Sequence, residues 1–303
     1  MYDIIIIGAG PAGMNAALNA VRAGRSVLVI EKETIGGQIS FAPKVENFPT
    51  VYSAPGADIM NNLFEQISQW NVEVALEEVV SVSKKGDTFE IKTDMDSYQA
   101  KSLIIATGVK HKHLDIEREN EMIGKGVSYC ALCDGQFYEN RDVTVIGDGN
   151  TALQYSMLLA TYCKSVTICT LFDKFFGDQV LIDRMKEKTK DNVVIKHNLM
   201  LTKLLGEDEI SGLEFKAKDG SIVKLDTAAV FVCIGQIPNN QIFSKLVKLD
   251  EQGYIVANEN GETSAPGIFV AGDCRTKSFR QMIGALSDGA NASFMACKYL
   301  DTK

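Results

Sequence analysis

Residues 4–13 read Ile-Ile-Ile-Ile-Gly-Ala-Gly-Pro-Ala-Gly, and this stretch decides the fold. Four consecutive β-branched residues are typical of a short buried strand. Glycines follow immediately, and a helical pattern then continues from Met14 to Ala23 before Gly24 ends it. The stretch therefore predicts a strand, a tight glycine turn and a helix.

A second predicted strand, Ser26 to Ile30, is followed by Glu31, which lies 18 positions after Gly13. A GxGxxG turn between a strand and a helix, with an acid about 20 residues further on, is the pattern of a dinucleotide-binding βαβ unit. Gly8 permits the tight turn, Gly10 lets a pyrophosphate approach the backbone, and Gly13 allows close packing of the helix. An acid at Glu31 accepts hydrogen bonds from ribose hydroxyls and repels a 2′-phosphate. The first unit therefore predicts FAD or NAD as its ligand.

The same pattern recurs in the middle of the chain. Residues 142–146 form an apolar run, 147–152 read Gly-Asp-Gly-Asn-Thr-Ala, and a predicted helix and a strand over 165–169 follow. Two such units predict an α/β protein with two Rossmann-like, three-layer dinucleotide-binding domains. The strand and helix after residue 267 cannot bury their faces alone, so we assign them to the first domain. The predicted first domain comprises residues 1–113 and 246–303, with residues 114–245 inserted as the central domain.

Residues 130–134 read Cys-Ala-Leu-Cys-Asp. A CxxC dithiol in an α/β protein is more often redox-active than structural. A structural zinc site needs four ligands, but the sequence has no second CxxC and only three histidines, so we predict no metal. One thiolate attacks a disulfide, its neighbour resolves the mixed disulfide, and Asp134 is placed to move the proton. A CxxC beside a dinucleotide site indicates an electron relay.

The composition excludes other classes of protein. Lys and Arg number 31 against 39 Asp and Glu, a net charge of −8, which argues against nucleic acid or an anionic membrane as partner. No apolar run approaches the roughly 20 residues that span a bilayer. Seven cysteines are an odd number, which does not suit a disulfide-stapled secreted scaffold. We therefore expect a globular protein of the reducing cytoplasm.

Taken together, these motifs resemble the low-molecular-weight thioredoxin reductases in order and spacing. The resemblance rests on Gly8 to Gly13, Glu31, Gly36-Gly37-Gln38, Glu46-Asn47-Phe48-Pro49, Ala106-Thr107-Gly108, Cys130 to Gly135, Gly272-Asp273 and Arg280-Gln281. It covers essentially the whole chain. It implies a thioredoxin reductase-like fold, FAD in the split domain, the redox dithiol in the central domain, thioredoxin as substrate and a homodimer.

The resemblance also implies roles for individual residues. Cys133 would face the flavin, Cys130 would attack the substrate and Asp134 would be the acid, while Asp273 would bind the ribitol chain. The residues implied to contact FAD are Gly8, Gly10, Pro11, Ala12, Gly13, Glu31, Lys32, Gly37, Gln38, Val45, Asn47, Val79, Ala106, Thr107, Gly108, Gly272, Asp273, Arg280, Gln281 and Met282.

The chain departs from the NADPH-using members after its second glycine turn. Those members carry a His-Arg-Arg cluster and a further Arg that hold the 2′-phosphate, but the aligned positions here are Thr170, Leu171, Phe172 and Phe176. Charged hydrogen bonds to phosphate contribute about 1.5–3 kcal/mol each, so losing two or three costs roughly 3–9 kcal/mol. Asp148 adds a negative charge inside the turn. We therefore expect a degenerate NAD(P)-binding-like fold that holds NADPH poorly.

A one-electron protein donor is chemically natural in place of a nicotinamide, because a flavin accepts electrons singly and passes two to a disulfide. The chain looks like the ferredoxin-dependent flavin thioredoxin reductases, which keep FAD and CxxC but lack the basic cluster. This resemblance predicts reduced ferredoxin as the electron donor. Two alternatives remain open. One is an NADPH- or NADH-dependent enzyme with atypical contacts, to which Asp173 could contribute, and the other is a non-enzymatic flavin-binding redox sensor.

Overall fold

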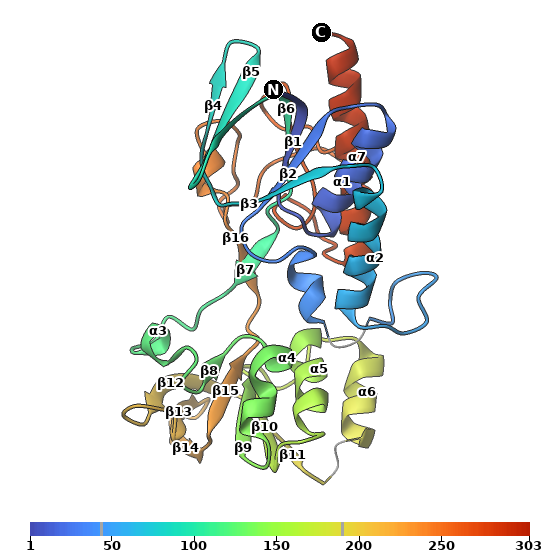
Figure 1. The fold of residues 1–303 in the computed structure, drawn as a ribbon. Helices are drawn as coiled ribbons and strands as arrows, with labels where there is room; N and C mark the ends of the chain where they lie inside the picture. The colour runs from blue at the N-terminus through green and yellow to red at the C-terminus, as the bar shows by residue number, and fades with distance from the viewer. Residues whose placement is uncertain (43–44, 189–190) are drawn as a thin grey trace. The chain divides into compact units, whose positions relative to one another are not determined.

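The computed structural model describes residues 1–42, 45–188 and 191–303. The chain divides into two compact units: Met1–Lys110 with Ile237–Lys303, and His111–Gln236. The second unit is inserted in the first, and the two connecting strands, β7 (Val109–His111) and β16 (Gln236–Pro238), pair with each other. Both units are α/β folds built on a parallel sheet core (Figure 1).

The first unit contains a seven-stranded sheet in the order β3-β2-β1-β6-β5-β4, with β17 also paired to β6. Strands β1, β2, β3, β6 and β17 run parallel, whereas β4 and β5 form an antiparallel hairpin beside β6. The strands are β1 (Tyr2–Ile7), β2 (Val27–Glu31), β3 (Glu73–Leu76), β4 (Val79–Lys85), β5 (Thr88–Thr93), β6 (Ser97–Ile105) and β17 (Ile268–Val270).

The period-two alternation of β1 makes this unit three-layered. Ile4 and Ile6 lie in the apolar cluster under helices α1 (Pro11–Arg22), α2 (Gly56–Ser68) and α7 (Met282–Asp301). Ile5 and Ile7 point to the opposite face and pack with side chains of β5 and of the 3-10 helix η3 (Gln241–Phe243). Figure 1 shows the three helices side by side along one face of the sheet. A further 3-10 helix, η1 (Gly37–Phe41), follows β2.

The second unit repeats this plan on a smaller scale. Its parallel sheet has the order β11-β10-β9-β15-β8, and a three-stranded antiparallel sheet, β12-β13-β14, packs on one of its faces. Helices α5 and α6 pack on the other face. The elements are α3 (Glu119–Met122), β8 (Val127–Ser128), α4 (Ala131–Asp134), η2 (Gly135–Tyr138), β9 (Asp142–Ile146), α5 (Asn150–Leu159), β10 (Ser165–Cys169), α6 (Gln179–Lys188), β11 (Val193–Lys196), β12 (Leu199–Leu205), β13 (Gly212–Ala217), β14 (Ile222–Asp226) and β15 (Ala229–Val232).

The domain boundaries differ slightly from those expected from the sequence, and residues 111–113 lie in the second unit rather than the first. Residues 237–245, expected in the central domain, lie in the first unit because Phe243 is fully buried in that unit's core and Asn240 donates to Cys274 O. One buried aromatic residue in a short 3-10 helix leaves no periodic signal. Within residues 72–93, β3 pairs in parallel with β2, and β4 and β5 form the antiparallel hairpin.

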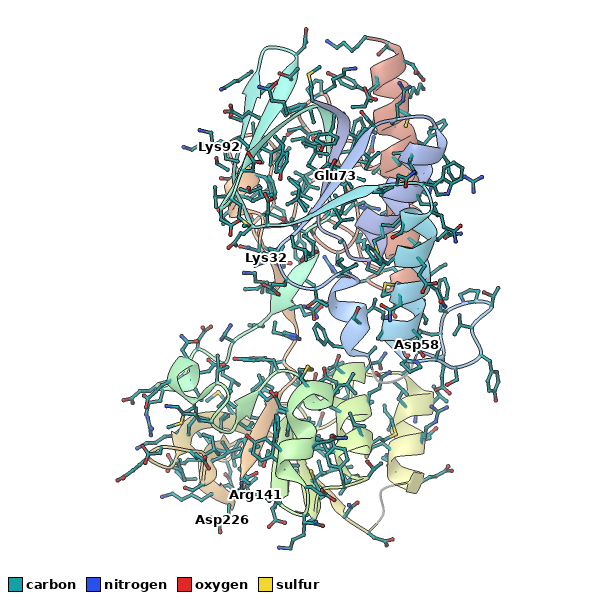
Figure 2. The ribbon with its side chains drawn as sticks, viewed as in Figure 1. Lys32, Asp58, Glu73, Lys92, Arg141 and Asp226 are labelled. Atoms are coloured by element: carbon teal, nitrogen blue, oxygen red, sulfur yellow. A yellow bond between two sulfur atoms is a disulfide. The ribbon has the colours of Figure 1, made fainter. Side chains whose placement is uncertain are left out.

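Most charged side chains of the described residues lie outside these cores, whereas those of Glu119, Arg275 and Asp288 are buried. The six that Figure 2 labels, Lys32, Asp58, Glu73, Lys92, Arg141 and Asp226, are all exposed. Among the described residues, no helix combines the length and apolar character needed to cross a bilayer.

Candidate functional site

Cys130 and Cys133 form a disulfide at the start of α4, with their Cα atoms 5.3 Å apart. Cys130 is the N-cap residue of this one-turn helix, and its Sγ atom accepts the backbone N–H of Cys133 at 3.1 Å. Within its unit Cys133 is exposed and Cys130 is half-buried. The pairing places both sulfurs where a thiol–disulfide exchange can take place.

Asp134 is joined to the dithiol through Ser128. The Ser128 hydroxyl donates to Asp134 Oδ2 at 2.6 Å, and Ser128 Oγ accepts the backbone N–H of Cys130 at 3.1 Å. Ser128 is buried at the end of β8, so the strand fixes the orientation of the carboxylate. Sequence reasoning missed Ser128, although a hydroxyl in a buried strand two residues before the first cysteine is a usable signal.

An aromatic cluster precedes the dithiol. The Tyr129 hydroxyl donates to the buried carboxylate of Glu119 and lies 3.0 Å from His113 Nδ1. Burial and the Glu119 carboxylate raise the pKa of Tyr129 well above its usual value, so Tyr129 stays neutral. Glu119 also accepts the backbone N–H groups of Leu114 and Asp115 at 2.8 Å each. The histidine pair 111 and 113 is therefore part of a structural cluster beside the cysteines.

The other cysteines are structural thiols. Burial raises the pKa of Cys163 to about 11, that of Cys169 to about 12 and that of Cys274 to about 11. At neutral pH all three are protonated, and buried thiols of this kind act as small apolar side chains.

The first glycine turn leaves no room for side chains at two of its positions. A Cβ on Gly8, where φ is +109°, would lie 2.3 Å from Ala106 O, and a Cβ on Gly13 would lie 1.8 Å from Gly8 O. Gly10 is different, because a Cβ there would meet no atom within 4 Å. Pro11 begins α1, and no side chain of the described residues caps this helix. The turn thus presents open space and uncapped N–H groups, which suit an anionic group.

Glu31 lies at the end of β2 beside this turn. Its Oε2 accepts the N–H of Ala9 and its Oε1 accepts the N–H of Glu33, both at 2.8 Å. Gly37 packs against the turn as well, since a Cβ on it would lie 3.2 Å from Gly10 Cα. The structure therefore brings Glu31 and Gly37 to the same turn as Gly10.

Lys32 and Val79 have different surroundings. Lys32, labelled in Figure 2, pairs with Glu33 at 2.8 Å and Glu78 at 3.7 Å. Val79 is buried in the cluster on the sheet face opposite α1.

A second part of the candidate cradle lies at the ends of β6 and β17. Ala106 is buried beside Gly8, and the Thr107 hydroxyl donates to Asn240 Oδ1 at 3.2 Å. Gly272 follows β17 with φ +83°, and a Cβ on it would lie 3.0 Å from Ala12 Cβ. The structure thus places Ala106 and Gly272, from two of the predicted segments, at the start of α1. Gly108, the last residue of the segment 106–108, directly precedes β7.

Asp273 has one buried oxygen with capacity to accept a further hydrogen bond. Its Oδ1 lies 3.1 Å from Lys277 Nζ as an ion pair, but the two are not aligned as a hydrogen bond. Within the described part of the chain, Asp273 Oδ1 has no hydrogen-bond partner. Sequence reasoning missed Lys277 as the neighbour of this carboxylate.

The remaining predicted residues occupy two places. Asn47 Nδ2 donates to Gln281 Oε1 at 3.0 Å, which joins two motifs that lie far apart in the sequence, and Met282 begins α7. The Arg280 guanidinium lies 4.3 Å from the centre of the Tyr254 ring. Val45 is buried, whereas Gln38 is exposed on η1.

The second glycine turn has the backbone of a nucleotide-binding turn, but its side chains differ from those of the first turn. A Cβ on Gly147 would lie 2.3 Å from Cys233 O, and Gly149 again faces open space. Asp148 lies between them, and burial raises the pKa of its carboxyl. The backbone N–H of Phe176 donates to Asp148 O at 2.7 Å, and Asn150 exchanges hydrogen bonds with Asp178. The loop after β10 is therefore fastened across the start of α5.

The positions that align with the missing bases are apolar or buried. Thr170 is fully buried, and its hydroxyl donates to Phe172 O at 2.6 Å and lies 2.7 Å from His197 Nδ1. Leu171, Phe172 and Phe176 are 53%, 49% and 58% exposed. The rings of Phe172 and Phe176 meet edge-on with their centres 5.4 Å apart. These four side chains supply no positive charge to a phosphate.

The chain matches the family model described as pyridine nucleotide-disulphide oxidoreductase over residues 2–289. It is 39% identical to a thioredoxin reductase of Treponema pallidum, over 99% of this chain and 98% of that protein. The crystal structure of Lactococcus lactis thioredoxin reductase in its FR conformation has a TM-score of 0.97, with 33% identity and full coverage of both chains. A ferredoxin-flavin thioredoxin reductase from Clostridium acetobutylicum has a TM-score of 0.55 and 28% identity, covering 100% of this chain and 99% of that one.

These likenesses cover the glycine turn, the dithiol and the segments around them together. Members of the group are FAD flavoproteins, and the Cys130–Cys133 pair is the disulfide that such an enzyme needs. The chain therefore belongs to the pyridine nucleotide-disulphide oxidoreductase family, as one of its FAD-dependent thioredoxin reductases.

Proposed function

We propose that this thioredoxin reductase takes its electrons from reduced ferredoxin rather than from NADPH. One observation carries the proposal. The four positions at the end of β10 that would hold a 2′-phosphate are the buried Thr170 and the apolar side chains of Leu171, Phe172 and Phe176. The backbone fold of the second unit persists because its glycine turn and helix packing need small residues, whereas the charges that recognise NADPH are absent from these positions.

The proposed donor is thermodynamically sufficient. A thioredoxin-type disulfide has a reduction potential of about −270 mV, and a plant-type ferredoxin has one of about −400 mV. Two electrons that fall through about 130 mV release roughly 6 kcal/mol. FAD supplies the chemistry that links the two partners, because it accepts electrons one at a time and delivers them in pairs.

We assign the cradle for FAD to the first unit. Gly10 offers open space at the uncapped start of α1, which suits a pyrophosphate, and Glu31 suits the ribose hydroxyls. Asp273, whose buried Oδ1 pairs with Lys277 but accepts no hydrogen bond from the described residues, suits a hydroxyl donor of the ribitol chain. The further residues proposed to line the cofactor are Gly8, Pro11, Ala12, Gly13, Lys32, Gly37, Gln38, Val45, Asn47, Val79, Ala106, Thr107, Gly108, Gly272, Arg280, Gln281 and Met282.

The dithiol residues divide the exchange reaction between them. The Cys130 thiolate attacks one sulfur of the thioredoxin disulfide, which forms a mixed disulfide and releases one thioredoxin thiolate. Asp134 is the group proposed to protonate that leaving sulfur, held in place by Ser128. The Cys133 thiolate then attacks Cys130 Sγ, which restores the Cys130–Cys133 disulfide and frees reduced thioredoxin. Thioredoxin gains two electrons and the dithiol loses them.

We further propose a homodimer. Helix α7 and the loop before it expose large apolar side chains: Phe279, Ile283 and Phe294. Exposed apolar side chains concentrated on one element favour a protein interface. Light scattering coupled to gel filtration tests this, since a mass near that of one chain would exclude it.

A nicotinamide-dependent enzyme is the second candidate, and one feature favours it. A hollow of about 440 Å³ is lined by Leu171, Phe172 and Asp173 on one side and by Lys216 and Lys218 on the other. These two lysines could supply, from β13 and the turn after it, the positive charge that the β10 loop lacks.

Rapid mixing under argon separates the two candidates. The holoprotein is mixed with reduced ferredoxin, NADPH or NADH, and thioredoxin disulfide reduction is followed. Turnover with ferredoxin alone supports the proposal, whereas fast turnover with micromolar NADPH overturns it. In that case, loss of turnover in Lys216→Ala with Lys218→Ala identifies the lysine hollow as the nucleotide site.

A further inference from the structure

A buried ionic network lies behind the Gly272–Asp273 turn. Asp288 of α7 binds the Arg275 guanidinium with two hydrogen bonds, Nε to Oδ2 at 3.0 Å and Nη2 to Oδ1 at 2.9 Å. Lys277 Nζ donates to the same carboxylate at 3.1 Å. Asp288 is 8% exposed and Arg275 is 5% exposed, so these charges depend on one another rather than on water.

The network extends directly to the turn. Asp288 Oδ2 accepts the backbone N–H of Gly272 at 3.1 Å. Lys277 Nζ also lies 3.1 Å from Asp273 Oδ1, so a single ammonium group bridges the two carboxylates. Two cations thus face the carboxylates of Asp288 and Asp273, and the exposed Glu259 also lies 4.0 Å from Arg275. Asp288 therefore reaches Asp273 by two routes, through the Gly272 backbone and through Lys277.

Tight packing fixes Asp288 relative to the first glycine turn. A Cβ on Gly289, the next residue along α7, would lie 2.2 Å from Ala12 O at the start of α1. A Cβ on Gly272 would lie 3.0 Å from Ala12 Cβ. Helix α7 and the 272–273 turn thus both press on the first turn of α1. Because both elements contact Ala12 closely, the Asp288 carboxylate on α7 can fix the position of the Gly272–Asp273 turn.

We propose that Asp288 is a positioning residue for FAD, which holds the Gly272–Asp273 turn against α1 and, through Lys277, aims Asp273 at the cofactor. The network ends at Asp273 Oδ1, the buried atom that has no hydrogen-bond partner in the described part of the chain. The Lys277 ammonium lies 3.1 Å from this oxygen without a hydrogen bond, which leaves the oxygen the capacity to accept one from a ligand hydroxyl. The inference rests on the cofactor and on the cradle proposed above, not on the electron donor, so either proposal can fail alone.

The charge on Asp288 persists at neutral pH. Burial acts to raise the pKa of Asp288, but the hydrogen bonds and positive charges of Arg275 and Lys277 outweigh burial and hold it below the ordinary value of 3.8. Replacing Asp288 by Asn keeps the shape and removes the charge that balances both cations.

The test compares Asp288→Asn with Asp3→Asn. Asp3 is a matched control in the same unit, because it also accepts a backbone N–H, from Ser26 at 3.0 Å, and pairs with a lysine, Lys101, at 2.8 Å. FAD is stripped from each protein, FAD affinity is measured by titrating the apoprotein, and the melting temperature of the apoprotein is measured by circular dichroism. We expect Asp288→Asn to weaken FAD binding about ten- to hundredfold and Asp3→Asn to leave it within about twofold of the parent.

The two measurements distinguish positioning from support of the fold. If Asp288→Asn lowers the apoprotein melting temperature but binds FAD as tightly as the parent, the positioning role is overturned. If Asp288→Asn does not fold, Lys277→Met decides, because it keeps the Arg275–Asp288 pair and removes the ammonium group that joins Asp288 to Asp273. Weaker FAD binding by Lys277→Met then supports the proposal, and parental affinity refutes it.

Discussion

The backbone N–H of Cys133 donates a hydrogen bond to Cys130 Sγ, with 3.1 Å between nitrogen and sulfur. A donor that points at a sulfur stabilises its thiolate, so in the reduced dithiol this bond favours Cys130 as the nucleophile. Cys133 has no equivalent bond among those found in the described residues. This asymmetry supports Cys130 as the attacking sulfur and Cys133 as its resolving partner.

Replacing Cys130 by Ser is expected to abolish thioredoxin reduction while the flavin remains reducible. The matched variant Cys133→Ser keeps the attacking thiol of Cys130 but lacks the thiol that resolves the mixed disulfide. It should therefore accumulate a covalent complex with thioredoxin. Anaerobic flavin spectra, turnover assays and non-reducing gels check both variants. Normal turnover by Cys130→Ser would refute the dithiol assignment, and a covalent complex formed only by that variant would reverse the two roles.

Replacing Asp134 by Asn removes the proposed proton donor and is expected to lower kcat by about a hundredfold or more. Ser128→Ala is the matched control, because it leaves the carboxyl in place but removes the hydroxyl that orients it at 2.6 Å. We expect a smaller loss in this variant, and a kcat that is less dependent on pH in Asp134→Asn. Parental turnover by Asp134→Asn would exclude Asp134 as the acid.

Two glycines of the same turn are expected to respond differently to alanine. In Gly13→Ala the new Cβ would lie 1.8 Å from Gly8 O, so the backbone must shift, and the apoprotein should lose about 1–3 kcal/mol or more. Gly10 has φ −74° and ψ −176°, which alanine adopts, and open space around it. Gly10→Ala should therefore leave apoprotein stability unchanged and weaken FAD binding. Chemical denaturation of both apoproteins and FAD titration test this, and tight FAD binding by Gly10→Ala would contradict the proposed cradle.

Much of the fold follows from the sequence because it depends on local patterns. The run Ile4–Ile7 alternates between two apolar clusters, and Gly8 and Gly13 are required by backbone contacts that any such turn makes. The Asp288 network could not be predicted, because it joins residues that are brought together only when α7 packs on α1. The sequence does show an acidic residue, Asp288, among small side chains of a mostly apolar helix. That pattern indicates a buried charge, but it does not identify the partners.

The loop that is hydrogen-bonded to the second glycine turn shows the same limit. The missing bases at 170–172 and 176 are visible in the sequence, but the hydrogen bond from Phe176 N–H to Asp148 O is not. That bond and the Thr170–His197 contact depend on how the loop folds back on itself. The sequence therefore predicts a site without positive charge. The structure adds that the loop after β10 is hydrogen-bonded to the glycine turn.

Asp3 provides a pH-dependent prediction. Partial burial acts to raise the pKa of Asp3, but hydrogen bonds from Lys101 and Ser26 outweigh it and lower the pKa to about 2. The folded pKa is thus below the unfolded one, so the stabilisation is complete above the ordinary pKa of 3.8 and is lost as the pH falls towards about 2. Asp3→Asn should lower stability at neutral pH by less than about 1 kcal/mol, since the pair is partly exposed and solvent screens it. Denaturation curves of parent and variant should converge at low pH, and a difference that grows there would contradict the assignment.

Restoring positive charge to the β10 loop should be possible at three of its four positions. Leu171, Phe172 and Phe176 are about half exposed and accept Arg, whereas Thr170 is fully buried and hydrogen-bonded, so His there would not fit. Leu171→Arg with Phe172→Arg, Phe176→Arg and Asp148→Gly should create measurable NADPH affinity. Calorimetric titration with NADPH measures this affinity. The uncharged control variant carries Leu171→Gln, Phe172→Gln and Phe176→Gln in place of the three arginines. Equal affinity in both sets would mean that charge is not what the site lacks.

The most direct test of the central claim is anaerobic reduction of the bound flavin, followed by its visible absorption as donors are added one at a time. The account predicts that reduced ferredoxin bleaches the flavin and that subsequent addition of thioredoxin disulfide restores its colour, with little change on addition of NADPH or NADH. Full bleaching by stoichiometric NADPH, or a flavin that reduced ferredoxin leaves oxidised, would contradict it.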